Sequence, residues 1–338
     1  MDYSRLDPQQ VLASLDAVGL RGDGRVLQLN SYENRVFQVF LEDGQAVVAK
    51  FYRPGRWSHA QIVEEHHFAL ELAAAEVPVV PPLVLHAAPG ATGLQLLGEP
   101  PTLALHHTPH GTHRFAVALR CAGREPELEA PSTLAQLGRF IGRLHAIGRL
   151  HPFEHRHRLD ARADGQRAIT LLLASGLVTD GERPAWQPVA EQALARLVAA
   201  FDAMQPLATL RLHGDCHLGN VLWRFHGDTP GPHVVDLDDA MQGPAVQDLW
   251  MLVSGDHATM AQQLNQLLGG YEHFCEFDDR ERSLIEPLRT LRMLRHSAWL
   301  AERWSDPTFP QNFPHFSTPA YWSQQTAQLR EQLELMAG

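Results

Sequence analysis

Lysine is almost absent from this chain of 338 residues, because Lys50 is the only one among 28 basic residues. Acidic residues number 39, which gives a formal net charge of -11 at pH 7. Nucleic-acid binding requires a basic face, so this balance argues against a nucleic-acid partner. It leaves room for a cationic substrate, although net charge does not locate a charged patch. A lysine that stands alone in this way is expected to be required by its site.

Cysteines and long apolar runs are also scarce. The three cysteines, Cys121, Cys216 and Cys275, lie far apart and are odd in number, which excludes a disulfide framework and indicates a reducing compartment. The longest candidate for a membrane span, residues 70–91, is interrupted by two glutamates and four prolines. The first residues do not have the pattern of a signal peptide. We therefore expect a cytoplasmic monomer with no membrane partner.

The remaining composition, with 44% hydrophobic and 20% charged residues, is that of an ordinary globular protein. The chain is long enough for two lobes that share a cleft. Hydrophobic periodicity predicts a mixed first part and a mainly helical second part. The expected helices are 8–18, 59–75, 134–145, 165–176, 187–204, 284–304 and 320–336, and the expected strands are 26–29, 36–40, 46–52, 94–97 and 103–105.

The most informative stretch is His213–Trp223, together with the segment 234–239 that follows it. Apolar residues precede the acidic residues in both, which predicts two short buried strands with polar groups at their ends. Asp215 and Asn220 share one loop, and Asp236 comes from the second strand. Two carboxylates and an amide are hard oxygen ligands for a magnesium ion that carries a phosphate, and a nearby carboxylate can deprotonate a hydroxyl. A polar turn between strands would explain one aspartate better than this whole set.

These residues resemble known phosphotransferases. The loop is similar to the protein-kinase catalytic loop His-Arg-Asp-x-x-x-x-Asn, with Gly214 in the arginine position, and closer still to that of aminoglycoside and choline phosphotransferases. Together with the segments 30–36, 51–54 and 243–250, it resembles the bacterial stress-response kinase A family of serine/threonine protein kinases. This resemblance covers nearly the whole chain.

The resemblance implies an α+β, bilobal, protein-kinase-like fold. Residues 1–109 would form a small antiparallel-sheet lobe that binds the nucleotide, and residues 110–338 a larger, mainly helical catalytic and substrate lobe. The implied activity is transfer of phosphate from ATP to serine or threonine hydroxyls of proteins, including the chain itself, in stress response. In this scheme Asp215 is the catalytic base, Asn220 and Asp236 hold Mg²⁺, Asp236 also counts as catalytic, and Asp238 is a further candidate for the metal.

The single lysine falls within a second motif. Lys50 ends the run Val-Val-Ala-Lys, which resembles the Val-Ala-Ile-Lys strand of kinases. The resemblance implies that its ammonium contacts the α- and β-phosphates and pairs with a glutamate on the next helix. Glu65 fits the register of that helix best, and its neighbour Glu64 is the rival. The alternative for Lys50 is a solvated strand lysine.

Two loops of the first part have predicted roles. The turn 30–34 takes the place of a glycine-rich phosphate loop but contains no glycine. A plain hairpin turn explains its spacing, while the family resemblance favours contact of Ser31 with the nucleotide. The histidine-rich run 106–111 is interpreted as the hinge between the lobes, whose backbone would meet the adenine edge.

Some polar residues of the second part are expected to be structural. Asp248 resembles the buried aspartate that accepts backbone hydrogen bonds from the catalytic loop. His145 is expected in the core or at the surface, and His213 and His217 are expected to brace the loop. A solvated or ion-paired face best explains the arginines of the helix 284–304, which are Arg289, Arg292, Arg295 and Arg303.

Two other functions remain open. A small-molecule kinase for an amino sugar, choline or a similar amino alcohol would use the same catalytic loop, so the loop cannot distinguish it from a protein kinase. An enclosed acidic pocket over Asp215 would favour the small cation, and an open, flat groove would favour a protein. A nucleotide-binding scaffold without catalysis predicts that the lysine, the base or a metal ligand is missing, and all three are present.

Overall fold

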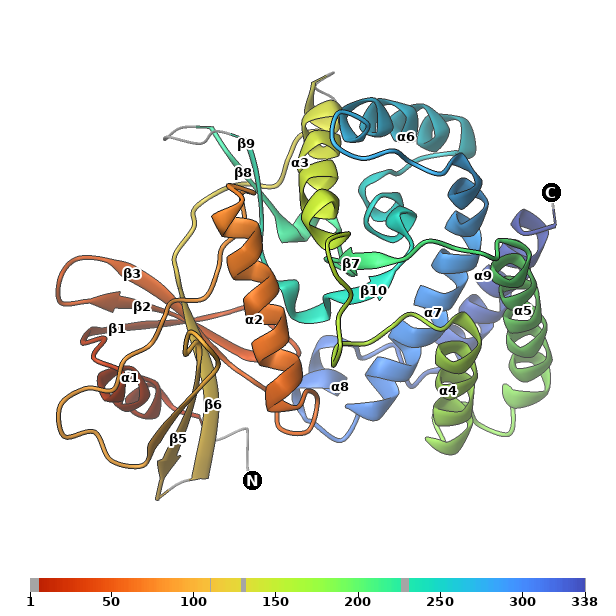
Figure 1. Cartoon of the computed structure of the whole chain (residues 1–338). Coiled ribbons are helices and arrows are strands. Elements are labelled where there is room, and N and C mark those ends of the chain that lie inside the picture. Colours follow the sequence, from red (N-terminus) through yellow and green to blue (C-terminus); the bar gives the residue numbers. More distant parts are fainter. Residues whose placement is uncertain (1–5, 110, 129–131, 226–230, 338) are drawn as a thin grey trace.

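The computed structural model describes residues 6–109, 111–128, 132–225 and 231–337. Within these ranges the chain forms two lobes (Figure 1), one built on a six-stranded sheet and the other mainly helical. The predicted bilobal α+β architecture is therefore confirmed. No helix in the described ranges is long and apolar enough to cross a membrane.

The sheet of the small lobe is antiparallel throughout. Its strand order is β1-β2-β3-β6-β5-β4, so the first three strands form a meander and β6 joins them to the hairpin of β4 and β5. The strands are β1 (Gly22–Leu29), β2 (Arg35–Leu41), β3 (Ala46–Phe51), β4 (Leu94–Leu97), β5 (Leu103–Thr108) and β6 (Gly111–Leu119).

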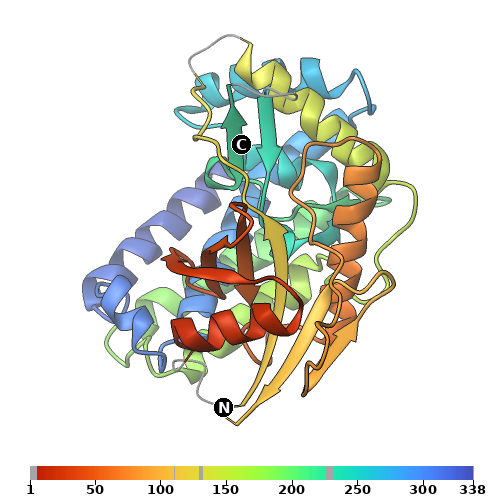
Figure 2. The ribbon, with the colours of Figure 1, turned by 90° about the vertical axis from the view of Figure 1, so that its left-hand side faces the viewer.

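The two faces of this sheet are covered by different helices. Helix α1 (Pro8–Ala17) packs on one face, where Val47, Ala49 and Phe51 of β3 join its core. Figure 2 shows α1 on the near side of the sheet, and Figure 1 shows α2 (His59–Ala74) between the sheet and the large lobe. Because strand side chains alternate between faces, Lys50 points away from the α1 core and towards the large lobe.

The start of α2 follows from local sequence. Ser58 is the N-cap: its hydroxyl accepts the N–H of Gln61, and the Gln61 side chain accepts the N–H of Ser58. This reciprocal pair satisfies two N–H groups that the helix itself leaves free. The predicted helix start after Ser58 is confirmed, so the register that carries Glu64 and Glu65 is fixed from its first turn.

The predicted hinge at residues 106–111 was wrong. In the structure Thr108 pairs with Gly111, so the run is the end of β5, a turn and the start of β6, while His110 lies outside the described residues. Strand β6 continues in the sheet to Leu119, and the chain crosses to the large lobe only after it. The local sequence could not reveal this, because a turn between paired strands and a turn between lobes use the same residue types. We propose a lobe boundary at residues 120–124 in place of residue 109.

The large lobe surrounds two small two-stranded ladders with helices (Figure 1). The ladders pair β7 (Leu210–Leu212) with β10 (Met241–Gly243) and β8 (Val221–Arg224) with β9 (Gly231–Val234). Their helices are α3 (Thr133–Gly148), α4 (Ala161–Ala174), α5 (Arg183–Ala203), α6 (His257–Tyr271), α7 (Ile285–Glu302), α8 (Thr308–Asn312) and α9 (Pro319–Leu335). Helices α6 and α8 are not among the predicted helices.

Helices α3 and α6 approach closely because glycines lie at their contact. A Cβ atom added to Gly138 of α3 would lie 1.8 Å from the carbonyl oxygen of Leu267, and one added to Gly270 of α6 would lie 2.0 Å from that of Ala135. No side chain fits between the two backbones at these points. The α3–α6 contact in turn fixes the end of α3 that carries His145.

This contact yields a stability prediction with a control one residue away. We expect Gly270→Ala to lower the free energy of unfolding by about 1–3 kcal/mol, because the new methyl group overpacks the helix contact. Gly269→Ala should raise it by about 0.5–1 kcal/mol, since a Cβ there meets nothing within 4 Å and alanine favours the helix. Urea unfolding measures both, and an equal effect of the two substitutions would contradict the close approach.

Candidate active site

The loop from His213 to Asn220 joins β7 to β8 and is held by one buried carboxylate. Asp248, which is fully buried, accepts hydrogen bonds from the backbone N–H groups of His213 (2.7 Å) and Gly214 (2.8 Å). Its Oδ2 also lies 3.2 Å from Nε2 of the buried His145. The predicted anchoring role of Asp248 is confirmed, although Asp248 lies in a short 3₁₀ turn. His145, expected in the core or at the surface, lies in the core.

Glycine at position 214 is required by the backbone. Gly214 has a φ of 86°, and an added Cβ would lie 2.2 Å from the carbonyl oxygen of Asp239. A side chain here would push the loop away from the second strand end. The replacement of the kinase arginine by glycine therefore allows the two acidic segments to touch.

Asp215 is held by an arginine and a histidine. Its carboxylate forms an ion pair with Arg292 of α7 and lies 3.4 Å from Nε2 of His217. Burial acts to raise the pKa of Asp215, but the hydrogen bond with His217 and the charge of Arg292 lower it well below its usual range. The carboxylate is therefore ionised and able to accept a proton once its partners release it.

The two acidic segments are tied together by hydrogen bonds. Nδ1 of His213 accepts the N–H of Asp215 (3.3 Å), which leaves its Nε2–H to donate to the carbonyl of Val235 (3.0 Å). The side-chain amide nitrogen of Asn220 donates to the backbone carbonyl of Asp215 (3.0 Å), and the backbone carbonyl of Asn220 accepts the N–H of Val235 (3.1 Å). No described residue donates a hydrogen bond to the side-chain oxygen of Asn220, and Asn220 lines the same cleft as Asp236.

Asp236 contacts the only lysine of the chain. Its backbone is left-handed, with a φ of 64°, a conformation that few residues other than glycine adopt and that functional sites retain. Oδ1 of Asp236 lies 2.6 Å from Nζ of Lys50, across the boundary between the lobes. Folding thus joins a strand of the small lobe to the strand end of the large one.

A second carboxylate lies close to this ion pair. Oδ1 of Asp238 is 4.0 Å from Nζ of Lys50 and is buried without a hydrogen bond to any described residue. Its other oxygen accepts bonds from Asn34 and Arg56, both at 3.0 Å. Burial acts to lower the pKa of Lys50, but Asp236 and Asp238 hold it well above its usual value. The lysine is accordingly charged.

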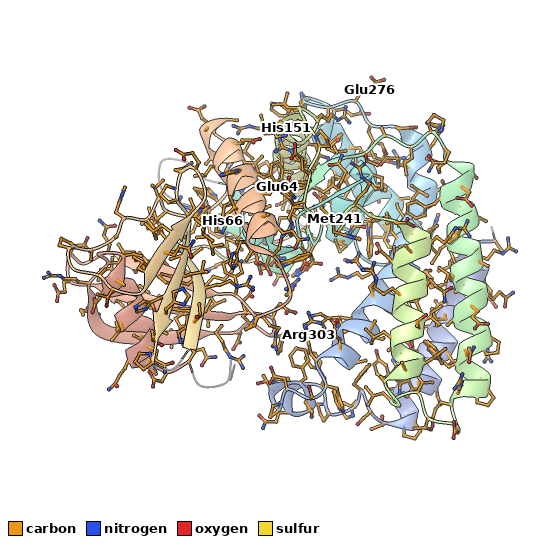
Figure 3. All side chains as sticks on the ribbon, turned by 60° about the horizontal axis from the view of Figure 1, so that its bottom comes forward. Glu64, His66, His151, Met241, Glu276 and Arg303 are labelled. Carbon is orange, nitrogen blue, oxygen red and sulfur yellow. The ribbon has the colours of Figure 1, made fainter. Side chains whose placement is uncertain are left out.

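The structure distinguishes between the two candidate glutamates of α2. Glu64 accepts three backbone N–H groups, from Glu154 (2.6 Å), His155 (2.9 Å) and Arg156 (2.7 Å), and so fastens α2 to the large lobe (Figure 3). Glu65 instead lines the cleft and is buried within the electrostatic range of Lys50, although no ion pair within 4.0 Å joins them among the described residues. Glu65 is thus the glutamate on the lysine side.

A cleft of about 770 Å³ lies between the lobes. It brings together all the predicted site residues, which are Ser31, Lys50, Glu65, Asp215, Asn220 and Asp236. Residues 117–121, which form the end of β6 and the first residues after it, also line the cleft. Ser31 accepts the N–H of Asn34 (3.3 Å), as in a local turn, and no described residue accepts its hydroxyl hydrogen. The cleft has the size of a small-ligand site.

The loop above the cleft is fastened to the large lobe through Glu33. This carboxylate lies 2.7 Å from Nε of Arg303 and accepts the indole N–H of Trp299 at 2.6 Å. Arg53 (3.2 Å) and Arg56 (3.4 Å) of the small lobe contact it too. Figure 3 shows Arg303 at the junction of the two lobes. We call these five residues the Glu33 cluster.

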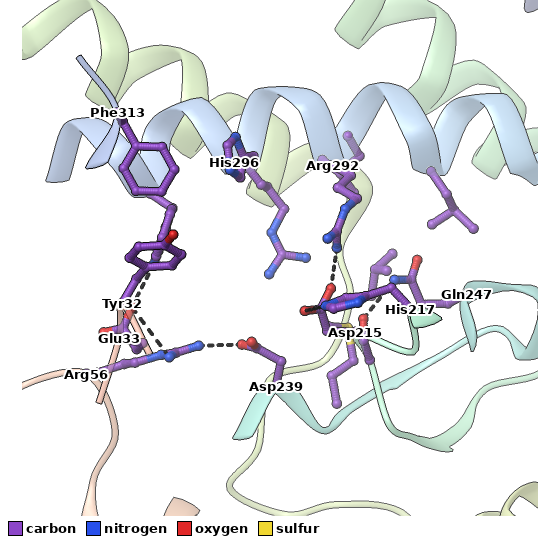
Figure 4. Close-up of a pocket in the computed structure, with 17 residues that line it drawn as sticks. Tyr32, Glu33, Arg56, Asp215, His217, Asp239, Gln247, Arg292, His296 and Phe313 are labelled. Atoms are coloured by element: carbon purple, nitrogen blue, oxygen red, sulfur yellow. Dashed lines mark hydrogen bonds and ion pairs between the residues drawn. The ribbon is translucent and has the colours of Figure 1, made fainter. Parts of the chain in front are cut away.

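A second pocket, of about 410 Å³, opens on the other side of Asp215 (Figure 4). One wall is the face of α7 that carries Arg292, Arg295 and His296. Because this pocket and the interlobe cleft share Asp215, it is the place from which a second substrate can reach a group bound in the cleft. We call it the acceptor pocket.

The oxygen groups beside Lys50 suit a hard divalent cation. No three His, Cys, Asp or Glu side chains form a metal cluster in the described part of the chain. Asp236, the amide of Asn220 and the unbonded oxygen of Asp238 offer two carboxylates and one amide. Small hard cations are usually held by one or two carboxylates together with substrate phosphates, so this sparse set fits such an ion.

Comparisons with known proteins identify the family. The model of the phosphotransferase enzyme family matches residues 25–307. The chain belongs to this phosphotransferase family. It is also 40% identical to "Stress response kinase A" of Salmonella choleraesuis (strain SC-B67) and to "Serine/threonine protein kinase RdoA" of Salmonella typhimurium. Each alignment spans 334 residues, 99% of this chain and 94% of the relative, so the family resemblance of the motifs is confirmed.

A solved phosphotransferase shares the fold. Amicoumacin kinase hAmiN, in complex with AMP-PNP, Ca²⁺ and Ami, superposes with a TM-score of 0.71 and covers 98% of this chain and 94% of its own. The identity is 17%, so the likeness concerns the fold alone. It confirms the predicted kinase-like arrangement of the two lobes.

Three residues of this phosphotransferase site were missed in the sequence. Arg292 was assigned to an ion-paired or solvated face, and it is ion-paired, but its partner is Asp215. Glu33 and Arg56 were given no role, yet both line the acceptor pocket and join the lobes. Only the i, i+3, i+4 spacing of cations in α7 hinted at the first of them.

The buried carboxyl of the phosphotransferase cleft gives a pH prediction. Burial raises the pKa of Glu65 from an ordinary 4.5 to about 7, against the opposing charge of Lys50. Between these values the folded chain holds a proton that the unfolded chain has released, so stability falls as pH rises from about 5 to about 7. Glu65→Gln should remove this fall. Between pH 5 and pH 7, the free energy of unfolding of the variant minus that of the wild type should therefore increase by on the order of 1–3 kcal/mol.

Urea unfolding at pH 5, 6, 7 and 8 measures this difference. Glu125→Gln, which neutralises an exposed carboxyl, is the control and should follow the wild type. A gap between Glu65→Gln and wild type that stays constant with pH would show that Glu65 is ionised throughout.

Proposed function

We propose that the chain is an ATP-dependent serine/threonine protein kinase that uses Mg²⁺, phosphorylates protein hydroxyls including its own, and serves in bacterial stress response. The observation that carries the proposal is the 2.6 Å contact of Lys50 with Asp236 in a cleft that also holds Asp215 and Asn220. The names of relatives that are 40% identical support the protein-kinase class.

Each charged group of the cleft has a role in this proposal. Lys50 and Asp236 now neutralise each other; in a complex with a metal–triphosphate, Lys50 would meet a phosphate and Asp236 would hold the metal. Asn220 and Asp236 would hold Mg²⁺, with Asp238 as a further candidate, and Glu65 would position Lys50. When bound, Mg²⁺ supplies charge neutralisation at the phosphates. The Ser31 hydroxyl donates to a phosphate oxygen.

Asp215 is the base in this proposal. It orients the acceptor hydroxyl and takes its proton as the hydroxyl oxygen bonds to the γ-phosphorus. The bond between that phosphorus and the β–γ bridging oxygen breaks, and ADP leaves with the bond electrons. Because Arg292 neutralises Asp215 in the structure, the acceptor must enter while this ion pair loosens.

The acceptor pocket favours a protein over a cationic amino alcohol. A small ammonium compound needs a free carboxylate, and the described carboxylates of this pocket are already engaged by arginine. Asp215 pairs with Arg292, Asp239 lies 2.5 Å from Arg56, and Glu33 belongs to its cluster. The pocket is therefore not the acidic enclosure that the small-molecule function predicts, and that function is the second candidate.

Labelling with ATP distinguishes the functions. The chain is incubated with γ-labelled ATP and Mg²⁺ alone, with a generic protein acceptor, and with a panel of amino sugars and amino alcohols. We expect label on serine or threonine of the chain and of the protein acceptor. Faster labelling of an amino alcohol would favour the second candidate. ATP binding without transfer to any acceptor would indicate a scaffold.

The base assignment has its own test. Asp215→Asn should lower the rate of transfer by about 10²–10⁴-fold, because the amide cannot take the hydroxyl proton, while ATP binding is retained. Asp202→Asn, at an exposed site on α5, is the matched control. If folded Asp215→Asn transferred phosphate at the wild-type rate, Asp215 would not be the base.

A further inference from the structure

One face of α7 supplies cations to the acceptor pocket. Arg292, Arg295 and His296 are spaced i, i+3 and i+4, so they project from the same side of the helix. Figure 4 shows Arg292 and His296 on this helix, above Asp215. Burial and the charge of Arg292 lower the pKa of His296, so the positive charge of this face at neutral pH comes from the two arginines.

Arg295 differs from the other arginines of the pocket. Arg292 has Asp215 as its partner, and Arg56 is shared among three carboxylates. Within the described part of the chain, no carboxylate oxygen lies within 4 Å of the Arg295 guanidinium, although its charge helps at longer range to lower the pKa of Asp164. A half-buried guanidinium that has no carboxylate nearby can bind the anionic group of a ligand.

The ion pair of Arg292 with Asp215 imposes a second requirement on the acceptor. A neutral or cationic acceptor that displaces Arg292, whose side chain is 43% accessible, leaves this cation without the carboxylate that neutralises it. An anionic acceptor offers Arg292 a replacement carboxylate and frees Asp215 for the hydroxyl. The exchange conserves the number of ion pairs, so the pocket discriminates by charge.

From these contacts we infer that Arg292, Arg295 and His296 form an anion-recognition subsite that selects serine or threonine acceptors flanked by acidic residues. The inference rests on the proposed protein-kinase function and assigns the specificity of that site. Arg295 binds the acidic neighbour of the acceptor, and Arg292 exchanges Asp215 for the same acidic segment.

The size of the pocket supports an extended peptide as the occupant. A volume of about 410 Å³ lies within the range of small-ligand sites, so it admits a few consecutive side chains but not a folded surface. A serine with acidic neighbours places its hydroxyl at Asp215 and its carboxylates along α7. A small hydroxy acid shares this chemistry, and the experiment separates it from the peptide.

Three peptides of one length test the subsite. Each carries a single serine, flanked by two aspartates, two asparagines or two arginines, and kcat and KM are measured with saturating ATP and Mg²⁺. We expect kcat/KM to be about tenfold higher for the acidic peptide than for the neutral one, and lower still for the basic one. Lactate, a small hydroxy acid, is offered in parallel.

Charge reversal in the subsite should reverse this order. Arg295→Glu should raise KM for the acidic peptide by about tenfold with little change in kcat, and it should favour the basic peptide. Arg295→Gln is expected to give a KM for the acidic peptide between those of this variant and the wild type. It replaces the charge-reversed variant in the test if that variant does not fold. Arg162→Glu on α4, an exposed residue 69% accessible, carries the same change in net charge and should retain the acidic preference.

The outcomes separate the subsite from the proposed function. Equal kcat/KM for the three peptides would overturn the subsite and leave the protein kinase intact. Labelling of lactate but of no peptide would overturn the peptide occupant. No transfer to any peptide or protein would overturn the proposed function and this inference with it. A preference for the acidic peptide that is lost in Arg295→Glu and retained in Arg162→Glu would establish the anion-recognition subsite.

Discussion

The ion pair between Lys50 and Asp236 is the contact on which the rest of the site depends. It joins a strand of the small lobe to a strand end of the large lobe at 2.6 Å. The local backbone has to place each of the two side chains for this contact to form. Strand alternation in β3 turns Lys50 away from the α1 core, and Asp236 adopts a left-handed backbone. The capped start of α2 sets Glu65 beside the lysine. The same charges that hold the cleft together are those that a metal–triphosphate would engage.

Most of the catalytic loop could be predicted because its information is local. The spacing from His213 to Asn220 follows from a single turn, and the anchoring aspartate was recognisable at position 248. The scarcity of lysine pointed to Lys50 without any knowledge of the fold. Gly214 was visible in the sequence, but the reason that glycine is needed there comes from the structure. Its positive φ and the nearby carbonyl of Asp239 leave no room for a side chain.

Other features were not predictable because they depend on contacts between distant segments. Arg292 lies 77 residues from Asp215 in the sequence, and nothing near either one indicates the pairing. The run 106–111 has turn residues, but only its pairing in the sheet shows that β6 follows it. Helix α6 did carry a signal, since Leu264, Leu267, Leu268 and Tyr271 repeat at helical spacing and are buried. This signal was overlooked rather than missing.

The Glu33 cluster has a consequence for the enzymatic cycle. The loop that covers the cleft is fastened to α7 by a carboxylate that contacts Arg303 and the indole of Trp299. Separation of the lobes breaks these mostly buried polar contacts together. Any motion that separates the lobes during turnover has to break the cluster, and dissolved salt screens its mostly buried charges only weakly.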